Sequence, residues 1–470
     1  MSFLDILKKY KKKIAIETQD TSISYGELIQ KSYELVNYFL QKGLKKKDII
    51  LVQLPNCQEF IYCYIACMLG GFIILPTNTE TDLRKIKEKF KKDKIKIFIK
   101  KKSDLKYIKN NFQYKKFRVD ESNIMSIFLT TGTTSAPKAI CHSSKDIVQN
   151  ALAFNKHNKI YSSRFFHLFP MNYMAGFLNS IISPLVTGGT IILHEKFNIR
   201  FASNFSKIIN KYKINYLWLN PTMVKTILFF QKKKANLGKN LKIFVATDAL
   251  SRIDKIKFLK KFSKILLESY GMTEILLFSS QKNNTKNKFL SHVGSIISGN
   301  KIYKNKKKSL IVSSKYINKK YFDFNKKKFL KNFQINKFDT GDIYKYTNKN
   351  LYILGRKKNI IIKGGINISP EYIENSIRYY KLIENCCVIS QPDQYYIENI
   401  CLVIKTLMNK KIDIKKFENF LTIKLDKNYF PKKILQVDNI PLNNNKKIDR
   451  KLLINNIEQS KIKILYEKIY

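Results

Sequence analysis

The feature that most constrains the fold is a repeated alternation of amphipathic helix and short apolar strand. Residues 25–43 have helical periodicity and end on a glycine suited to a helix C-cap, and the apolar strand IILVQL follows at 49–54. The alternation continues with a helix from Glu59, a strand at 71–76, a basic helix from Asp82 and a strand at 94–100. Residues 207–247 show a further alternation of helices and apolar strands. This order predicts an α/β fold whose large N-terminal domain has parallel, doubly wound sheets with helices on both faces.

The pattern changes in the last third of the chain. From about 300 to 355, short strands such as SLIVSS and LYILG are separated by lysine-rich turns, which indicates a small β subdomain. The segments CCVIS, ICLVIKTLM and KKFENFLTIKL then return to mixed strand and helix, enough for a compact α+β domain. The 470 residues are ample for more than one domain. We therefore expect an N-terminal domain over 1–356, which includes the β subdomain at 300–355, and a C-terminal α+β domain over 357–470.

The formal net charge of +53 would ordinarily suggest a nucleic acid or an anionic membrane as partner. Only eight of the 88 basic residues are arginine, however, and the lysines are spread over loops and presumed helix faces. A nucleic-acid surface would use arginine for bidentate contacts, interleaved with aromatic residues on one face. We therefore expect no specific nucleic-acid partner. A noncatalytic or nucleic-acid-binding protein stays open as an alternative, as does peripheral membrane contact through lysines.

Apolar windows and cysteines favour a cytoplasmic protein without a transmembrane segment. The most apolar window, 61–76, is short for a membrane span and contains a Gly-Gly break, so a buried helix followed by a strand fits it better. The first residues lack the apolar core of a signal peptide. No CxxC pair or histidine cluster accompanies the cysteines, which predicts free buried thiols and no metal site at positions 57, 63, 67, 141, 386, 387 and 401.

Residues 128–140, FLTTGTTSAPKAI, gather hydroxyl groups, a glycine and a lysine directly after apolar residues. Hydroxyls and exposed backbone N–H groups donate to several phosphate oxygens at once, and a lysine adds a point charge. The Walker pattern, GxxxxGK followed by Ser or Thr, is absent. Taken alone, the segment fits a polyphosphate cradle and a polar surface turn equally well.

Four further segments favour the cradle. They are SYGMTE at 269–274, TGD at 340–342, GRKKNIIIKGGINISP at 355–370 and PLNNNKKIDR at 441–450. Together with 128–140, and in this order, they resemble the signature segments of the adenylate-forming superfamily, which includes acyl- and aryl-CoA ligases, luciferases and peptide-synthetase adenylation domains. The resemblance covers nearly the whole chain. It implies that ATP and a carboxylic acid react to an acyl-adenylate and pyrophosphate, and that a thiol then attacks the mixed anhydride.

The resemblance also implies roles for individual residues in binding ATP and Mg²⁺. The loop that holds the β- and γ-phosphates is matched by Thr130, Thr131, Gly132, Thr133, Thr134 and Lys138. The adenine and the ribose are matched by Tyr270, Gly271, Asp342 and Arg356. Thr273 matches the hydroxyl at the α-phosphate, and Glu274 matches the Mg²⁺ ligand. The alternatives are an ordinary core aromatic for Tyr270 and a solvated acid at a helix start for Glu274.

A further set of implied roles concerns the C-terminal domain. Lys447 matches the lysine that bridges the substrate carboxylate and the α-phosphate region, which makes it, with Thr273 and Glu274, a candidate catalytic residue. Lys358 matches the hinge about which the mobile C-terminal domain swings between an adenylating and a thioester-forming pose. Gly364 and Gly365 match the loop that lines the thiol channel. A plain interdomain linker is the alternative for the hinge.

Several positions depart from the superfamily's pattern. Ser135 and Ala139 stand where the phosphate loop usually has glycine, and ATDAL at 246–250 replaces a Gly-Gly-Ala-Pro type of adenine segment. Lys446 occupies a glycine position, and Tyr372 stands where an acid is usual. A side chain at a glycine position fills space that a close backbone approach to a ligand would use, so these changes put high turnover in doubt. None of them removes a charged catalytic group.

The acyl pocket is expected to begin in PMNYMAGF at 170–177, with further walls near 220–223 and 247–249. Its first lining residues are Tyr173, Met174, Ala175 and Gly176, of which the first two also fit core packing. Superfamily members that activate α-amino acids usually place an aspartate here, and none is present, although Asp248 is an alternative source of a carboxylate. We therefore expect an uncharged acyl or aryl acid, with CoA as acceptor and a carrier-protein phosphopantetheine as the alternative acceptor.

Overall fold

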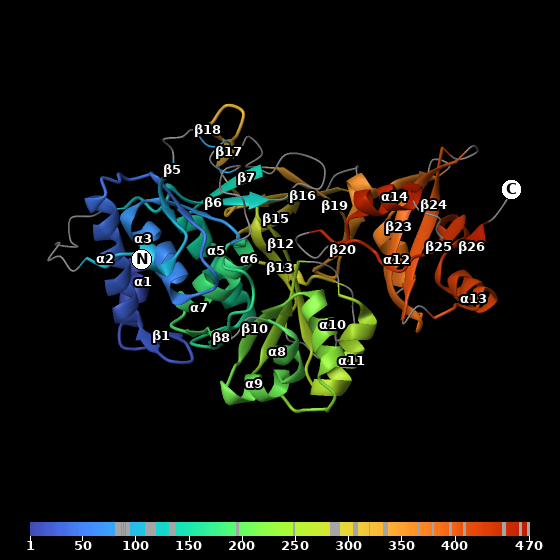
Figure 1. Cartoon of the computed structure of the whole chain (residues 1–470), viewed down its shortest axis with the longest axis horizontal. Coiled ribbons are helices and arrows are strands. Elements are labelled where there is room, and N and C mark those ends of the chain that lie inside the picture. The colour runs from blue at the N-terminus through green and yellow to red at the C-terminus, as the bar shows by residue number, and fades with distance from the viewer. Residues whose placement is uncertain are drawn as a thin grey trace. The chain divides into compact units, whose positions relative to one another are not determined.

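The structure is a computed structural model that describes residues 1–79, 86, 88, 90, 95–108, 119–130, 138–193, 197–247, 250–282, 292–303, 309–318, 320–331, 337–363, 366–377, 380–393, 397–407, 410–443, 448–459 and 463–467. Figure 1 follows its helices and strands from the blue N-terminus to the red C-terminal region. The chain divides into two compact units: residues 1–250, 254–303 and 312–338 form the first, and residues 251–253, 304–311 and 339–470 form the second. The boundary of a mobile domain after residue 356 stays a prediction.

The first unit contains a seven-stranded sheet with the order β18-β17-β7-β6-β4-β3-β5. Its strands are β3 (Ile49–Val52), β4 (Ile73–Pro76), β5 (Ile95–Ile99), β6 (Ile124–Thr130), β7 (Lys138–Ser143), β17 (Lys320–Asp323) and β18 (Lys328–Lys331). The pairs β3–β4, β3–β5 and β4–β6 are parallel, as the alternation predicted. Most of the helix expected from Asp82 lies outside the described residues.

Local sequence sets the limits of the helices beside this sheet, α2 (Tyr25–Gln41) and α3 (Gln58–Gly70). Ser24 and Glu27 form a capping box, in which the Ser24 hydroxyl accepts from the Glu27 N–H at 3.1 Å and the Glu27 carboxylate accepts from the Ser24 N–H at 2.7 Å. Gly71 follows α3 with a φ of +71°, which glycine adopts without strain. The buried helix and strand predicted for 61–76 are confirmed. Among the described residues, no helix is long and apolar enough to cross a membrane.

The described residues between 300 and 355 form short strands, as predicted. The hairpin of β17 and β18 pairs in antiparallel with β7 and so extends the seven-stranded sheet. This pairing satisfies the backbone groups at the edge of β7, and Phe322 of β17 stacks on Phe90 at 4.5 Å. The other strands of the segment are β15 (Asn300–Tyr303), β16 (Ser309–Ser314), β19 (Phe338–Thr347) and β20 (Asn350–Arg356).

A nine-stranded sheet with the order β14-β13-β12-β11-β10-β8-β9-β1-β2 completes the first unit. Its strands are β1 (Ile14–Glu17), β2 (Ser22–Ser24), β8 (Arg164–Phe166), β9 (Thr190–Ile192), β10 (Tyr216–Leu219), β11 (Lys242–Val245), β12 (Leu266–Met272), β13 (Leu276–Ser280) and β14 (Ser295–Ile296). The run β9-β8-β10-β11-β12 is parallel, which confirms the alternation expected over 207–247. β12 and β13 are antiparallel.

The helices of this part of the chain include α1 (Phe3–Lys9), α5 (Ser144–Asn158), α6 (Met174–Phe177), α7 (Ser183–Leu185), α8 (Ile199–Ser203), α9 (Phe205–Lys211), α10 (Pro221–Phe230) and α11 (Arg252–Phe262). A π-helical turn, Leu178–Ile182, joins α6 to α7. The ring of Phe154 on α5 packs on Trp218 at 5.5 Å and on Phe244 at 5.3 Å, which fixes this helix on the nine-stranded sheet. Trp218 is the one tryptophan of the sequence and is buried.

The second unit has the α+β composition expected for 357–470. β21 (Ile361–Lys363), β22 (Ile366–Ile368), β23 (Ile383–Asp393), β24 (Ile397–Thr406), β25 (Lys433–Gln436) and β26 (Lys463–Glu467) form its sheet. Its helices are α12 (Pro370–Ile377), α13 (Ile414–Lys424) and α14 (Arg450–Gln459). All seven cysteines of the chain are free and buried, as predicted.

Candidate active site

The segment SYGMTE forms the end of β12 and the tight turn into β13, so Glu274 lies between two strands and not at a helix start. Gly271 is required here, because a Cβ at this position would lie 2.3 Å from the carbonyl oxygen of Leu276. The strand register slips between Tyr270 and Gly271, and Leu276 has a φ of +59°. The half-buried ring of Tyr270 meets Phe278 edge-on at 6.2 Å. The turn therefore has a specific shape that presents Thr273 and Glu274.

Hydrogen bonds from outside the turn hold its backbone. Nε2 of His142, on β7, lies 2.6 Å from the carbonyl oxygen of Thr273. The backbone N–H of Asn318 donates to the carbonyl oxygen of Glu274 at 2.8 Å. Within the turn, the N–H of Ile275 donates to the carbonyl oxygen of Met272 at 3.1 Å. Neither His142 nor Asn318 was expected at the site, since neither lies in a signature segment.

The segment expected to hold the phosphates, residues 130–138, runs from the end of β6 to the start of β7. Thr130 ends β6 and pairs in register with Lys138, which begins β7. Thr131, Gly132, Thr133, Thr134 and Ser135 lie outside the described residues. Ala139 was expected to intrude on a ligand, but it is buried in the core cluster that contains Cys141 and Phe322. Because side chains alternate along a strand, this methyl group lies on the face of β7 opposite His142.

The expected acyl segment is tied to the same hairpin. Tyr173 precedes α6 and is 40% exposed, whereas Met174 is buried and Ala175 is half-buried. Gly176 is required, because a Cβ there would lie 2.1 Å from the carbonyl oxygen of Pro170. The next ring, Phe177, stacks with Phe128 of β6 at 5.9 Å. The segment thus lies against β6, which leads into the phosphate loop.

Tyr173 also links the acyl segment to the turn. Burial of its hydroxyl raises the pKa of Tyr173 above the usual value, and the Glu274 carboxylate raises this pKa further. The phenol therefore stays neutral at physiological pH, and it lies close enough to sense the charge of Glu274. Within the first unit, contacts thus join the β6–β7 hairpin to the turn of Thr273 and Glu274 through His142, and to the expected acyl segment through Phe128 and Phe177.

Asp342 and Arg356, both expected at a ribose site, form an ion pair in the second unit. They are directly opposite in the antiparallel pair of β19 and β20, and Nε of Arg356 lies 2.7 Å from Oδ1 of Asp342. The Asp342 side chain is 3% exposed, whereas that of Arg356 is 44% exposed. Gly341 precedes Asp342 with a φ of +72°, and Thr340 accepts from the Asp342 N–H at 3.1 Å through its hydroxyl. The TGD turn thereby fixes the backbone of the buried carboxylate.

The other residues expected in the second unit are placed only in part. Lys358 lies in the 3-10 turn Lys357–Asn359 that follows β20. Gly364, Gly365, Lys446 and Lys447 lie outside the described residues. A β-bridge between Leu442 and Ile448 closes the segment that contains Lys447 at its base. The ring of Tyr372, which stands at a usual acid position, packs on Tyr429 at 5.1 Å.

The segment at 246–250 has an unusual backbone. Thr247 has a φ of +81°, a conformation that costs a β-branched residue strain. Asp248 and Ala249 lie outside the described residues, and the N–H of Leu250 donates to Oε1 of Glu268 at 3.4 Å. The other Glu268 oxygen accepts from Nζ of Lys255, so a buried ion pair lies directly beside this segment. Neither member of the pair was expected from the sequence.

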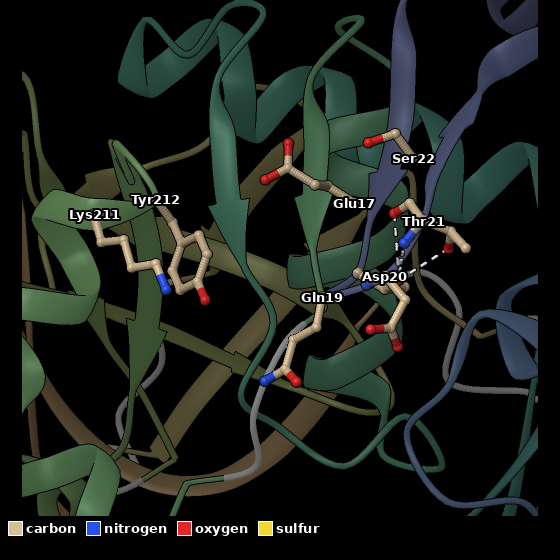
Figure 2. Close-up of a pocket in the computed structure, with 8 residues that line it drawn as sticks. Glu17, Gln19, Asp20, Thr21, Ser22, Lys211 and Tyr212 are labelled. Carbon is tan, nitrogen blue, oxygen red and sulfur yellow. Dashed lines mark hydrogen bonds between the residues drawn. The ribbon is translucent and has the colours of Figure 1, made fainter.

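A separate polar hollow of about 630 Å³ lies beside the loop between β1 and β2, as Figure 2 shows. Its lining residues are Glu17, Thr18, Gln19, Asp20, Thr21, Ser22, Lys211 and Tyr212. Glu17 is paired with Arg164 at 2.8 Å. None of the expected site residues lines this hollow.

The residues present fit Mg²⁺ bound together with a polyphosphate. Among the described residues, no group of three or more His, Cys, Asp or Glu side chains could form a protein cage for a metal. Mg²⁺ usually binds through one or two carboxylates plus substrate phosphates, not in such a cage. Glu274 supplies one half-buried carboxylate on a fixed turn, which is the donor that this mode of binding needs.

Comparison with known proteins places the chain in a family. Residues 3–308, more than half of the chain, match the model of the AMP-binding enzyme family, and the chain therefore belongs to that family. A crystal structure of ATP-bound MatB from Rhodopseudomonas palustris superposes with a TM-score of 0.81, at 21% identity and over 97% of this chain and 98% of that one. This likeness shows the adenylate-forming fold that the sequence predicted.

Two relatives show the range of the family. The 2-succinylbenzoate–CoA ligase of Lactococcus lactis subsp. lactis (strain IL1403) is 29% identical over 299 residues, which are 61% of this chain and 60% of the ligase. The alignment thus spans less than two thirds of that relative. Gramicidin S synthase 2 of Brevibacillus brevis is 23% identical over 494 residues, which cover 96% of this chain and 11% of the synthase.

Proposed function

We propose that the protein activates a carboxylic acid with ATP and Mg²⁺ and then transfers the acyl group to the thiol of CoA. The observation that carries this proposal is the hydrogen bond of His142 with Thr273. It joins the phosphate hairpin, which is the pair of strands β6 and β7 with the loop between them, to the turn of Thr273 and Glu274. The stacking of Phe177 on Phe128 of β6 at 5.9 Å places the expected acyl segment against the same hairpin. These two observations support a site in which the strand after the expected phosphate loop and the turn of Thr273 and Glu274 act together.

In the first half-reaction, a carboxylate oxygen of the acid attacks the α-phosphorus of ATP. A bond from that oxygen to phosphorus forms, the bond from phosphorus to the bridging oxygen breaks, and pyrophosphate leaves with the electron pair. Both reactants are anionic, so the site must supply positive charge and fixed positions rather than a nucleophilic side chain. In this scheme the Thr273 hydroxyl donates to the α-phosphate, Glu274 holds Mg²⁺, and Lys447 bridges the carboxylate and the α-phosphate.

Other residues orient the nucleotide, and the hinge at Lys358 moves the C-terminal domain between the two half-reactions. Asp342 accepts from the ribose hydroxyls, and Arg356 both pairs with Asp342 and contacts the ribose. Bound Mg²⁺ supplies charge that offsets the repulsion between phosphates and acid. In the second half-reaction the thiol loses its proton to solvent, its sulfur bonds to the acyl carbon, the acyl–oxygen bond breaks, and AMP leaves with the electron pair. Rotation at Lys358 brings Gly364 and Gly365 to the thiol channel for this step.

The acid is proposed to be an uncharged acyl or aryl acid. Of the residues at the start of the acyl segment, Tyr173 is neutral at physiological pH, and Met174 and Ala175 carry no charge. The likeness to a CoA ligase supports CoA as acceptor. The likeness to gramicidin S synthase 2 is the observation behind the second candidate, transfer to a carrier-protein phosphopantetheine. Seven free cysteines support a reducing compartment, and we propose the cytoplasm.

A pyrophosphate-release screen tests the proposal. The protein is incubated with ATP, Mg²⁺ and a panel of aliphatic and aromatic carboxylic acids, and thioester formation is followed with CoA or with a phosphopantetheinylated carrier. Acid-dependent release of pyrophosphate with formation of an acyl-CoA is the expected result. A thioester formed only on the carrier would favour the second candidate. No release with any acid would overturn both and leave a noncatalytic protein.

A further inference from the structure

A buried histidine lies on the strand that follows the phosphate loop. His142 is 1% exposed, and its Nε2 is 2.6 Å from the carbonyl oxygen of Thr273. A carbonyl oxygen only accepts hydrogen bonds, so Nε2 must carry a hydrogen. The strand begins four residues earlier, at Lys138, which places His142 about 13 Å along the strand from the end of the loop.

The contact joins two parts of the site that are far apart in sequence. His142 belongs to the antiparallel pair of β6 and β7, in which it faces Ser126. The Thr273 carbonyl belongs to the turn whose neighbouring carbonyl, that of Glu274, accepts from the Asn318 N–H at 2.8 Å. Two successive carbonyl groups of the turn are therefore fixed from outside, one by a side chain of the phosphate hairpin.

We propose that His142 is a positioning residue that holds the turn of Thr273 and Glu274 at a fixed distance from β7, the strand that follows the expected phosphate loop. The inference rests on the proposed function, which supplies the roles of that loop and that turn. A single ATP has to reach the loop with its β- and γ-phosphates and the turn with its α-phosphate and metal. An imidazole has only two side-chain torsions, so it holds this spacing more rigidly than a long flexible side chain would.

A positioning role and a purely structural role predict different effects. If His142 only satisfied a buried carbonyl, its loss would lower stability and leave ligand binding by the folded protein unchanged. If His142 positions the turn, its loss leaves the Glu274 carboxylate no longer held in place before the metal binds. More Mg²⁺ is then needed to support ATP binding. The Mg²⁺ concentration for half-maximal ATP binding therefore separates the two roles.

The experiment measures ATP binding by calorimetry over a series of Mg²⁺ concentrations, with thermal unfolding measured in parallel. For His142→Leu we expect the half-maximal Mg²⁺ concentration to rise about fivefold or more, which corresponds to the loss of one buried hydrogen bond. His142→Gln should restore most of the wild-type value, because its amide N–H can donate to the same carbonyl. This measurement does not depend on knowing the carboxylic acid.

Asn155→Leu is the matched control. Nδ2 of Asn155, which is also buried, donates to the backbone carbonyl of Ser183 at 2.7 Å, away from the turn. This variant should lose stability and keep the wild-type Mg²⁺ dependence. An unchanged Mg²⁺ dependence in folded His142→Leu, or no recovery in His142→Gln, would overturn the positioning role while the proposed function stands. A wild-type protein that binds no ATP at any Mg²⁺ concentration would overturn both.

Discussion

Gly271 gives the sharpest test of the turn, because its Cα faces the backbone of β13. A Cβ at this position would lie 2.3 Å from the carbonyl oxygen of Leu276, and real Cβ contacts essentially never fall below 3.0 Å. Gly271→Ala must therefore open the gap by at least 0.7 Å, the difference between the two distances. The obstructing atom belongs to the backbone and cannot swing aside as a flexible side chain would. Overpacking of this kind costs about 1–3 kcal/mol.

This shift of the backbone displaces the residues proposed to bind ATP, because Tyr270 precedes Gly271 and Thr273 lies two residues after it. A misplacement of about 1 Å can lower the rate of a reaction that depends on orientation by about 10²-fold. We expect Gly271→Ala to slow adenylate formation by this factor. The strain alone should lower the thermal midpoint by only about 2–10 °C.

The assay combines acid-dependent pyrophosphate release with the fluorescence of Trp218, which reports whether the first unit is folded. Gly238→Ala is the matched control, since a Cβ at Gly238 would have no atom within 4 Å. This control should keep wild-type activity and stability. Wild-type activity in Gly271→Ala would refute the argument that the close approach to β13 sets the geometry of the turn.

Three further predictions concern the second unit and the core. Asp342→Asn should raise the KM for ATP about tenfold and leave that for the acid unchanged, because it weakens charge-assisted bonds to the ribose and to Arg356; initial rates test this, and an unchanged KM would contradict the ribose assignment. Lys447→Ala should abolish pyrophosphate release and retain thioester formation from a preformed adenylate; unchanged release would refute its catalytic role. Burial lowers the pKa of His167 to about 4, below its unfolded value of 6.5, so the unfolded state binds more protons in this window. Stability is thus fully present above pH 6.5 and falls as the pH drops towards 4, by about 2 kcal/mol at pH 5. Urea unfolding followed by Trp218 fluorescence measures this loss, and a wild-type protein whose stability is the same at pH 5 and 7 would contradict the assignment.

Much of the fold could be predicted because its determinants are local. The alternation of helix and strand, the capping box of Ser24 and Glu27, and the glycine after α3 all act within a few residues. Signature segments are recognisable for the same reason, since Asp342 and Thr340 achieve their geometry within one turn. Such features can be found without knowing which distant parts of the chain meet.

The contacts that sequence reasoning missed join distant residues. His142 and Thr273 are 131 positions apart, and no pattern near either residue indicates the pairing. The same holds for the addition of β17 to β7, which depends on the packing of the whole sheet.

The segment at 246–250, which replaces a glycine-rich pattern, shows how surrounding contacts hold a residue in a strained backbone conformation. Thr247 keeps a φ of +81° although this conformation costs a residue with a Cβ roughly 1–2 kcal/mol. Strain of that kind persists only where the surroundings determine the backbone more strongly than the residue does. The Glu268 carboxylate, held by Lys255, accepts from the N–H of Leu250 and supplies such a constraint. The surroundings of Thr247, and not its own conformational preference, therefore determine the backbone at this position.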